Sequence, residues 1–316
     1  MKKLSSRCLH CWEIWDGDNE RHPQCSRKFF GTINPPTLEY GMGDLEKLEA
    51  KILRTHVAVP GVQPKISLDF NGTDKGKEGR ITLVGLWGQY ILKPPTVKYP
   101  SMPEVEDATM HLAEATGIQT VPHSMIRLKS GELAYITKRI DRSGKEKIAM
   151  EDMCQITERL TEDKYKGSLE QVGKTIRQYS TQPGLDTINF FELILFCYLT
   201  GNADMHLKNF SLWNPSLGEI QLAPAYDLVG TKLLLPQDLE ESALSINGKK
   251  KNLRRKDFEA IALNMVIPAK AIGNTFTKFT QAKEKWMALL DKSFMPDALK
   301  KEYKDLVIVR SKILGL

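Results

Sequence analysis

Three polar residues follow the most apolar stretch of the chain at spacings that suit phosphoryl transfer. Asp204 comes shortly after Gly201, Asn209 follows five residues later, and Asp227 lies eighteen residues beyond Asn209. An aspartate can orient a substrate hydroxyl and accept its proton, while an asparagine and a second aspartate can hold Mg²⁺ against nucleotide phosphates. The pattern predicts all three as catalytic residues, with Asn209 and Asp227 as the Mg²⁺ ligands.

The element expected to position Asp204 is a buried helix over the apolar segment 187–199. Asp186 or Thr187 is the expected N-cap and Gly201 the C-terminal stop. Asp204 would then lie on a loop anchored to a rigid helix, a suitable place for a catalytic group. The alternative is structural: an Asx-turn at Asn202 or Asp204 and a helix cap at Asp227.

A second constellation lies near the N-terminus, where Cys8 and Cys11 are followed after ten residues by His22 and Cys25. Two closely spaced pairs of soft ligands are typical of a tetrahedral structural Zn²⁺ site. Four protein ligands would leave no open position, so we do not expect catalysis there. The alternative is a set of reduced thiols beside an unrelated histidine.

Two further features could bind phosphates. A Pro-Gly turn between two strands is followed by polar residues, and its backbone could cover phosphate groups, although an ordinary β-turn explains it as well. The residues of this turn are Gly61, Val62, Gln63, Pro64 and Lys65. Lys93 ends a strand, and Glu106 lies in the first turn of a helix expected from Pro103 to Gly117. A Lys93–Glu106 pair would supply a fixed cation, whereas the alternatives are an exposed lysine and simple complementarity to the helix dipole.

The expected elements change from strands to helices near residue 145, which predicts an α+β protein with two lobes. We expect three parts: a Cys/His zinc-knuckle-like segment at 1–35, an N-lobe at 36–145 and a helical C-lobe at 146–316. Strands are expected at 57–59, 65–68, 81–86, 89–93 and 133–142. Helices are expected at 151–160, 167–179 and 187–199, followed by amphipathic helices over 269–316.

Composition limits the class of protein. Of 316 residues, 41% are hydrophobic and 27% charged, as in ordinary globular proteins. The net charge of +6 suits an anionic ligand but does not indicate nucleic-acid binding. No signal peptide or membrane span is visible, and the five cysteines fit a reducing compartment, so we expect a cytoplasmic protein. The basic run 249–256 is expected to be a solvated turn and helix start; a nucleic-acid patch is the alternative.

Taken together, these residues resemble the HipA family of serine/threonine kinases, the toxins of bacterial toxin–antitoxin pairs. The similarity runs from about Val57 to the C-terminus and is most specific at 201–211, GNADMHLKNFS. The other matching segments, in chain order, are 61–65, 91–93, Glu106 with 112–118, 139–142, 151–155 and 223–227.

The resemblance implies a two-lobed protein-kinase-like fold, with a mixed β N-lobe and an all-helical C-lobe, that binds ATP and Mg²⁺. Asp204 would be the catalytic base, with Asn209 and Asp227 on Mg²⁺. Residues 61–65 would form the phosphate loop, and Lys93 would contact the ATP phosphates. Further nucleotide-site residues implied by the resemblance are the hinge residues Lys138, Arg139 and Ile140, together with His206 and Tyr226.

Two departures from the family pattern bear on partners. Only 56 residues precede Val57, which resembles a shorter family form whose missing subdomain is a separate small protein. The family often has autophosphorylated serines before the loop glycine, where this chain has Ala58, Val59 and Pro60. Control by a bound antitoxin is therefore expected in place of self-inactivation. The expected substrate is a protein, which in relatives can be an aminoacyl-tRNA synthetase. Alternatives are a small-molecule phosphotransferase and a kinase-like regulatory module without turnover.

Overall fold

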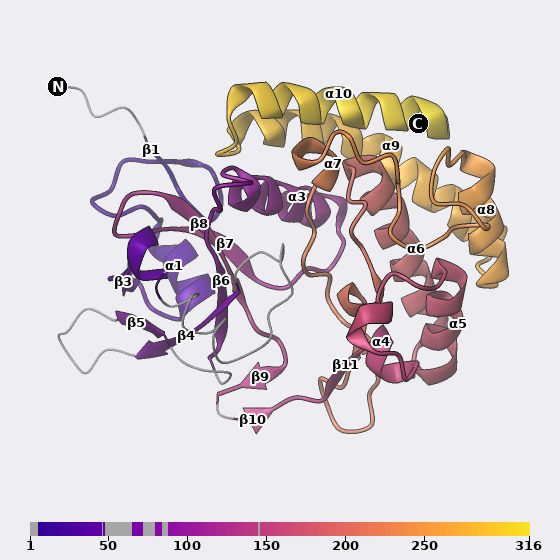
Figure 1. The fold of residues 1–316 in the computed structure, drawn as a ribbon, viewed down its shortest axis with the longest axis horizontal. Helices are drawn as coiled ribbons and strands as arrows, with labels where there is room; N and C mark the ends of the chain where they lie inside the picture. The colour runs from indigo at the N-terminus through magenta and orange to yellow at the C-terminus, as the bar shows by residue number, and fades with distance from the viewer. Residues whose placement is uncertain (1–5, 46, 48–64, 72–79, 84–87, 145) are drawn as a thin grey trace. The chain divides into compact units, whose positions relative to one another are not determined.

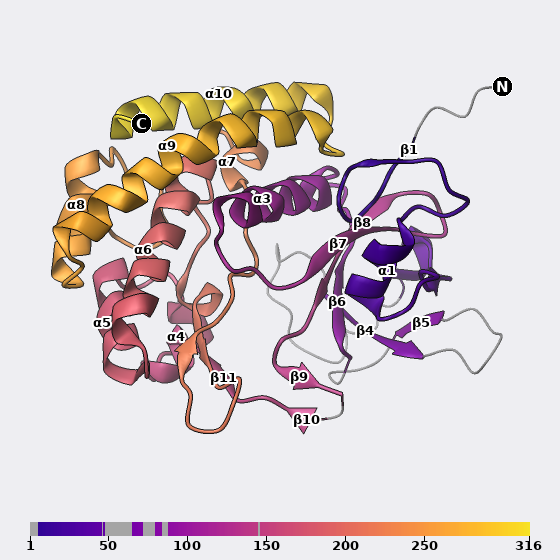
Figure 2. The same ribbon diagram turned by 180° about the vertical axis from the view of Figure 1, so that it is seen from behind.

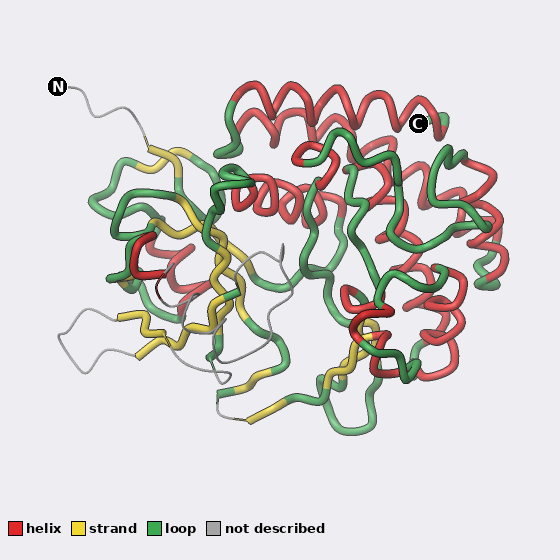
Figure 3. Tube along the Cα trace, viewed as in Figure 1, coloured by secondary structure: helices red, strands yellow, loops and turns green. Residues whose placement is uncertain are grey.

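The computed structural model describes residues 6–45, 47, 65–71, 80–83, 88–144 and 146–316. The chain divides into two compact units, Met1–Asp107 with Val121–Lys145, and Ala108–Thr120 with Glu146–Leu316. Strands dominate the first unit and helices the second (Figure 3). The Cys/His segment at 1–35 belongs to the first unit.

The first unit is built on a mixed six-stranded sheet. In spatial order its strands are β3 (Thr37–Leu38), β5 (Arg80–Leu83), β4 (Ile66–Asn71), β6 (Tyr90–Lys93), β8 (Leu133–Lys138) and β7 (His123–Arg127). The β3–β5 pair is parallel and the other pairs are antiparallel. The other elements assigned to this unit are β1 (Ser6–Arg7), β2 (Ile14–Trp15), α1 (Pro23–Phe30) and β9 (Arg142–Ser143).

One face of this sheet carries the unit's hydrophobic core. Alternate residues point to the same face of a strand, and Ile66 and Leu68 of β4 are both buried there. Helix α1 lies against the sheet (Figures 1 and 2), and Phe29 and Phe30 at its end belong to the same core. The N-terminal segment therefore shares its core with the sheet.

Helix α3 (Met102–Thr116) supplies its first residues to the first unit and the remainder to the second. It ends as expected at Gly117, whose φ of 82° lies in the left-handed region that glycine adopts without steric cost.

The second unit is mostly helical but contains a three-stranded sheet that the expectation of an all-helical C-lobe did not include. The sheet consists of β11 (Met150–Asp152), β12 (Ser211–Trp213) and β13 (Gln221–Leu222). The remaining elements are β10 (Glu146–Lys147), α4 (Met153–Ile156), η1 (Thr161–Asp163), α5 (Leu169–Tyr179), α6 (Pro183–Thr200), η2 (Leu207–Asn209), α7 (Thr231–Leu234), α8 (Arg255–Asn264), α9 (Ala269–Lys292) and α10 (Asp297–Leu314).

The prediction of one helix over 151–160 is wrong. Residues 150–152 pair antiparallel with β12, so these residues form a strand and not the start of a helix. Asp152 then caps α4 through a reciprocal pair of hydrogen bonds with Gln155, so that the helix begins only at Met153.

Helix α6 begins earlier than its expected cap at Asp186 or Thr187. Pro183 occupies the first helical position, where its missing N–H costs nothing. Asp186 is instead buried inside the first turn, where Oδ2 accepts hydrogen bonds from the Ser180 hydroxyl at 2.6 Å and the Leu222 amide at 2.9 Å. It ties the start of α6 to β13.

The C-terminal helices enclose α6. Helices α9 and α10 lie side by side (Figures 1 and 2). Trp286 of α9 is fully buried, and the centre of its ring lies 5.5 Å from the centre of the Phe196 ring in α6. Its indole N–H donates to the Leu112 carbonyl and the Thr116 hydroxyl of α3, each at 3.0 Å. An apolar helix surrounded in this way is a rigid support.

Two surface expectations can be compared with the structure. Within the described residues, no helix combines the length and apolar character that crossing a membrane requires.

The basic run 249–256 forms a turn and the start of α8, in agreement with the expected solvated turn. Lys249 pairs with Asp257 at 2.7 Å and Arg255 with Glu259 at 2.8 Å, so acidic neighbours offset part of its charge.

Gly201 provides a test of the stop at the end of α6. Its φ is 73°, and an added Cβ would lie 2.6 Å from Leu306 Cδ2. We expect Gly201→Ala to lower the free energy of unfolding by about 1–3 kcal/mol, because a side chain is strained at this φ. Denaturant titration measures the change. Gly184→Ala in the exposed first turn of α6, where no atom lies within 4 Å of the added Cβ, is the matched control and should not destabilise.

Candidate active site

The loop that carries Asp204 is held at the end of α6 by backbone hydrogen bonds. The Asn202 amide donates to the Cys197 carbonyl at 2.8 Å, and the Ala203 amide donates to the Thr231 hydroxyl at 2.9 Å. Asn202 is buried, and its side-chain oxygen accepts from the Asp204 amide at 3.3 Å. The Asp204 side chain is exposed. The structure therefore presents this carboxylate to solvent from a fixed backbone.

Asn209 is tied directly to the same loop. Its side-chain Nδ2 donates to the Asp204 carbonyl at 3.1 Å, and its own amide donates to the His206 carbonyl at 2.9 Å. With the amide nitrogen used in this way, the carboxamide oxygen is the atom suited to a metal ion.

A short hairpin connects Asn209 to Asp227. Strands β12 and β13 pair antiparallel, and the Ala223 amide donates to the Ser211 carbonyl at 2.9 Å. The Tyr226 hydroxyl donates to the Lys208 carbonyl at 3.0 Å and lies 2.6 Å from the Ser211 hydroxyl. This hydroxyl is thus engaged inside the second unit, where it holds the two ends of the hairpin together.

Asp227 has a φ of 60°, in the left-handed region that few residues other than glycine adopt. Strained backbone of this kind persists only where surrounding structure imposes it, and it clusters at functional sites. Asp227 acts electrostatically on the His206 ring, as does Asp204. The second unit therefore brings the two predicted carboxylates to the same histidine.

His206 has only 7% of its surface exposed. Burial lowers the pKa of His206, although both aspartates act in the opposite direction, so the imidazole is neutral at pH 7. Its Nδ1 atom has no hydrogen-bond partner among the residues that the structure describes.

Sequence reasoning missed Tyr165, whose hydroxyl donates to Asp204 Oδ1 at 2.7 Å. Its ring packs edge-on against His206 at 5.1 Å. Burial and the bond to Asp204 raise the pKa of Tyr165, so the phenol stays protonated and keeps donating. No periodic pattern or spacing marks this residue, because it lies in a polar segment 39 residues before its partner.

The predicted Lys93–Glu106 pair is present in the first unit. Lys93 Nζ lies 2.5 Å from Glu106 Oε1, and both side chains are almost fully buried. The ammonium group also lies 5.4 Å from the centre of the Tyr135 ring. Strand β6 and helix α3 therefore hold a charged pair in a position that an isolated lysine would not adopt.

The remaining predicted nucleotide residues are only partly placed. Lys138 ends β8 and Arg139 follows it, and their amides donate to the Pro122 and Gln89 carbonyls at 2.8 Å each. Ile140 comes next and is partly exposed. Lys65 is exposed beside β4. Gly61, Val62 and Gln63 lie outside the described residues, as do Ala58, Val59 and Pro60.

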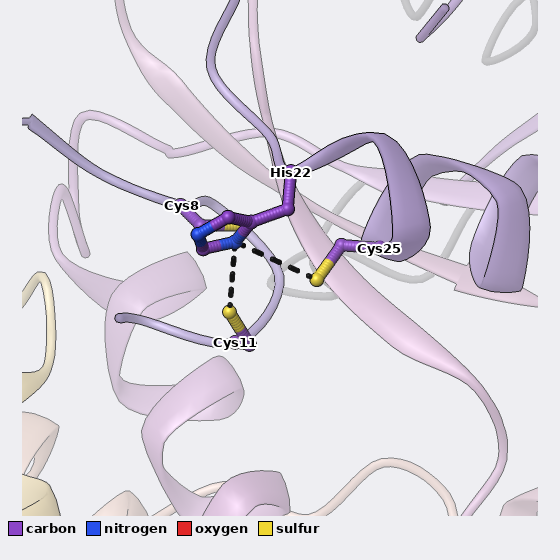
Figure 4. Close-up of side chains that lie close together, drawn as sticks. All are labelled: Cys8, Cys11, His22 and Cys25. Carbon is purple, nitrogen blue, oxygen red and sulfur yellow. Dashed lines mark hydrogen bonds between the residues drawn. The ribbon is translucent and has the colours of Figure 1, made fainter. Parts of the chain in front are cut away.

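The four predicted zinc ligands lie together in the first unit. The sulfur atoms of Cys8, Cys11 and Cys25 and a ring nitrogen of His22 are all within 4.8 Å of one another. Figure 4 shows the His22 ring facing the thiols, with Nδ1 at 3.3 Å from Cys11 Sγ and 3.8 Å from Cys25 Sγ. The spacing seen in the sequence thus corresponds to one compact donor set.

Comparison with known proteins identifies the family. The HipA-like C-terminal domain matches residues 57–287, which is most of the chain. The protein belongs to this family. All three predicted catalytic residues, and the Lys93–Glu106 pair, fall within the match.

Two curated relatives of this HipA-like protein are named as kinases. The protein named "Putative kinase Y4dM" from Sinorhizobium fredii is 31% identical over 214 residues, which cover 63% of this chain and 52% of the relative. The chain therefore spans about half of that relative's length. A protein named "Putative kinase" from Haemophilus influenzae is 28% identical over 284 residues, covering 78% of this chain and 80% of the relative.

Two solved structures share the fold. HipA from Shewanella oneidensis, in a complex with HipB and operator DNA, superposes with a TM-score of 0.69 at 19% identity, covering 86% of this chain and 71% of HipA. The Helicobacter pylori proinflammatory kinase CtkA superposes with a TM-score of 0.53 at 18% identity, covering 80% and 96%. The expected α+β kinase-like fold is confirmed.

The buried pair predicts a large and asymmetric response to mutation. Lys93→Met leaves the Glu106 carboxylate buried without its cation, so we expect a loss of about 3–5 kcal/mol in unfolding free energy at pH 7. Replacing both residues, as in Lys93→Met with Glu106→Leu, should recover much of this loss. Lys304→Met is the control because Lys304 pairs with a mostly exposed Asp291, and it should cost at most about 1 kcal/mol. Equal losses for Lys93→Met and Lys304→Met would contradict a buried pair.

Glu104, in the first turn of α3, predicts a pH dependence. Burial raises the pKa of its carboxyl to about 7, helped by the charge of Asp107. An unfolded glutamate titrates near pH 4.3. The folded state therefore binds more protons between these values, and stability falls as pH rises through this window. Glu104→Gln should raise the melting temperature at pH 8 and leave it nearly unchanged at pH 4; the reverse pattern would contradict the shift.

Proposed function

We propose that this protein is an ATP- and Mg²⁺-dependent serine/threonine protein kinase of the HipA type. The observation that carries the proposal is the loop after α6. It presents an exposed Asp204, locks Asn209 to the Asp204 backbone and leads through a braced hairpin to Asp227. Membership of the HipA-like family and the names of the relatives support the same activity.

Asp204 would act on the substrate hydroxyl. Tyr165 donates to Oδ1 of this carboxylate, and Oδ2 would be the oxygen that meets the acceptor. A carboxylate in this position accepts the proton of a serine or threonine hydroxyl as that oxygen attacks the γ-phosphate. Because hydrogen bonds hold the backbone of Asp204, less entropy would be lost in aligning its carboxylate with the substrate hydroxyl.

Asn209 and Asp227 would hold the metal. Their carboxamide and carboxylate oxygens are the ligand types that Mg²⁺ prefers, and Mg²⁺ needs few protein ligands because phosphates and water supply the others. When bound, Mg²⁺ would offset the charge that develops on the transferred phosphoryl group. The left-handed backbone of Asp227 and the hydrogen bonds of Tyr226 fix the backbone position from which the Asp227 side chain extends.

The first unit would supply the remaining contacts to ATP. Glu106 keeps the Lys93 ammonium in place, and Lys93 would contact the phosphates. The amides of Lys138 and Arg139 are already used within the first unit, so contacts to adenine would fall to their carbonyl oxygens or to Ile140. Residues 61–65 would cover the phosphates, and His206 would face their outer end.

Regulation by a partner follows from the same resemblance. The solved Shewanella HipA is bound to HipB and operator DNA. We infer a growth-inhibiting cytoplasmic toxin, with an antitoxin or a small N-subdomain-like protein as its partner. No serine stands at 58–60 to switch the enzyme off by autophosphorylation. The substrate would be a protein, with an aminoacyl-tRNA synthetase as the first candidate to test.

Asp204→Asn tests the proposed chemistry. We expect transfer of labelled phosphate from ATP to a protein acceptor to fall by about 10²–10⁴-fold, because general-base assistance is lost. ATP binding, measured by calorimetry, should be retained. Asp305→Asn, at an exposed position of α10, is the control and should transfer phosphate like the parent protein.

Two outcomes would contradict the proposal. Full transfer by Asp204→Asn would show that this carboxylate is not the base. Transfer by the parent protein only to small molecules such as aminoglycosides or sugars would place the enzyme in a different class of phosphotransferase.

A further inference from the structure

We propose that Cys8, Cys11, His22 and Cys25 bind one structural Zn²⁺, and that this metal secures the N-terminal half of α3 through Trp12. The donor set lies entirely in the first unit and includes none of the residues assigned to phosphoryl transfer.

The separations fit a tetrahedral metal. With Zn–S near 2.3 Å and Zn–N near 2.0 Å, neighbouring ligand atoms in a tetrahedron lie about 3.5–3.8 Å apart. His22 Nδ1 lies 3.3 Å from Cys11 Sγ and 3.8 Å from Cys25 Sγ, and all four ligand atoms are within 4.8 Å of one another. Small side-chain shifts would therefore complete the coordination.

The surroundings of His22 select the correct nitrogen. Nε2 lies 3.2 Å from the Ile14 carbonyl, which can only accept a hydrogen bond, so the ring proton belongs on Nε2. Nδ1 is then the unprotonated nitrogen, and it is the one that faces the thiols (Figure 4). Zinc-bound histidines usually donate their other N–H to a carbonyl or carboxylate in this way.

The charge of the site is also balanced. Zn²⁺ with three thiolates and a neutral imidazole carries one net negative charge. Arg21, the neighbour of His22, is 3% exposed. It donates to the Ser124 hydroxyl at 3.3 Å and to the Met125 carbonyl. This buried cation would offset the negative charge of the occupied site.

The segment that carries the ligands has little regular structure of its own. Strands β1 and β2 have two residues each, and Cys25 lies in the first turn of α1. The segment docks on β7 because the Leu9 carbonyl accepts the Met125 amide and the Ser124 hydroxyl, both at 3.0 Å. Metal binding supplies the folding energy that such a segment lacks.

Trp12 links this segment to α3. It directly follows Cys11, is fully buried, and has a left-handed φ of 64°. Its indole N–H donates to Asp107 Oδ2 at 2.9 Å, and His123 Nδ1 lies 3.2 Å from Asp107 Oδ1. Asp107 is the neighbour of Glu106 in the same helix. The metal would thereby help to hold Glu106 against Lys93. An effect of the metal on ATP binding through this pair rests on the proposed function.

The metal itself is measured first. The full chain, purified and dialysed against trace Zn²⁺, should contain one zinc per molecule by atomic emission. Co²⁺ in its place should give the thiolate charge-transfer and tetrahedral d–d absorption bands. Cys11→Ser and Cys25→Ser should lose both signals, whereas His22→Cys, which keeps four ligands, and Cys154→Ser, outside the cluster, should retain them. A parent protein without zinc and without cobalt bands overturns the site, whatever the variants do.

The link to α3 is tested by hydrogen exchange in the parent protein. Removal of the metal with a chelator should speed exchange in the N-terminal segment and in the first half of α3. Trp12→Phe should keep the metal and still speed exchange in α3, because the bond to Asp107 is lost. Unchanged exchange in α3 after chelation overturns the link. Neither readout uses phosphoryl transfer, and Asp204→Asn should retain zinc, so failure of this proposal is separable from failure of the kinase.

Discussion

The burial of α6, and its abrupt end at Gly201, is the constraint on which the Asp204 loop depends. Trp286 of α9 packs against Phe196 of α6 and donates to α3, and α10 contacts α6 as well. Most side chains of α6 are buried, so the helix cannot slide or rotate without exposing apolar surface. The chain leaves this helix through one left-handed residue, and the next few amides are hydrogen bonded. These contacts fix the backbone position of Asp204, although its own side chain is exposed.

In the first unit the corresponding constraint is a pair of charges inside a dry environment. Neither Lys93 nor Glu106 could remain charged there alone, because the cost of leaving water exceeds what any nearby apolar packing returns. Each therefore specifies the position of the other. Asp107, the next residue of α3, accepts the Trp12 indole N–H and lies beside His123, so the N-terminal segment is tied to the same part of the helix. The proposed phosphate contact and the proposed metal site would both depend on this short stretch of α3.

Sequence patterns were informative where a residue's partners lie nearby in the chain. Gly117 and Gly201 end helices because backbone geometry selects glycine there, and the Cys/His pairs are close enough for their spacing to predict a cluster. The patterns failed at 151–160 and at Asp186. There, strands and hydrogen-bond partners distant in the chain compete with the helical preference of the local residues. Tyr165 was missed for the same reason, since its role depends on a contact across 39 residues.

The sequence by itself determined the family, the α+β class, the candidate residues for catalysis and metal binding, and the Lys93–Glu106 pairing, because these depend on residue type and spacing. Only the tertiary structure decided how these residues are held. It showed the three-stranded sheet that follows the Asp204 loop, the Tyr165 hydroxyl bonded to Asp204, the left-handed backbone of Asp227 and the indole bond from Trp12 to Asp107. These features depend on which buried polar groups find partners after the chain has packed, and no local preference encodes that outcome.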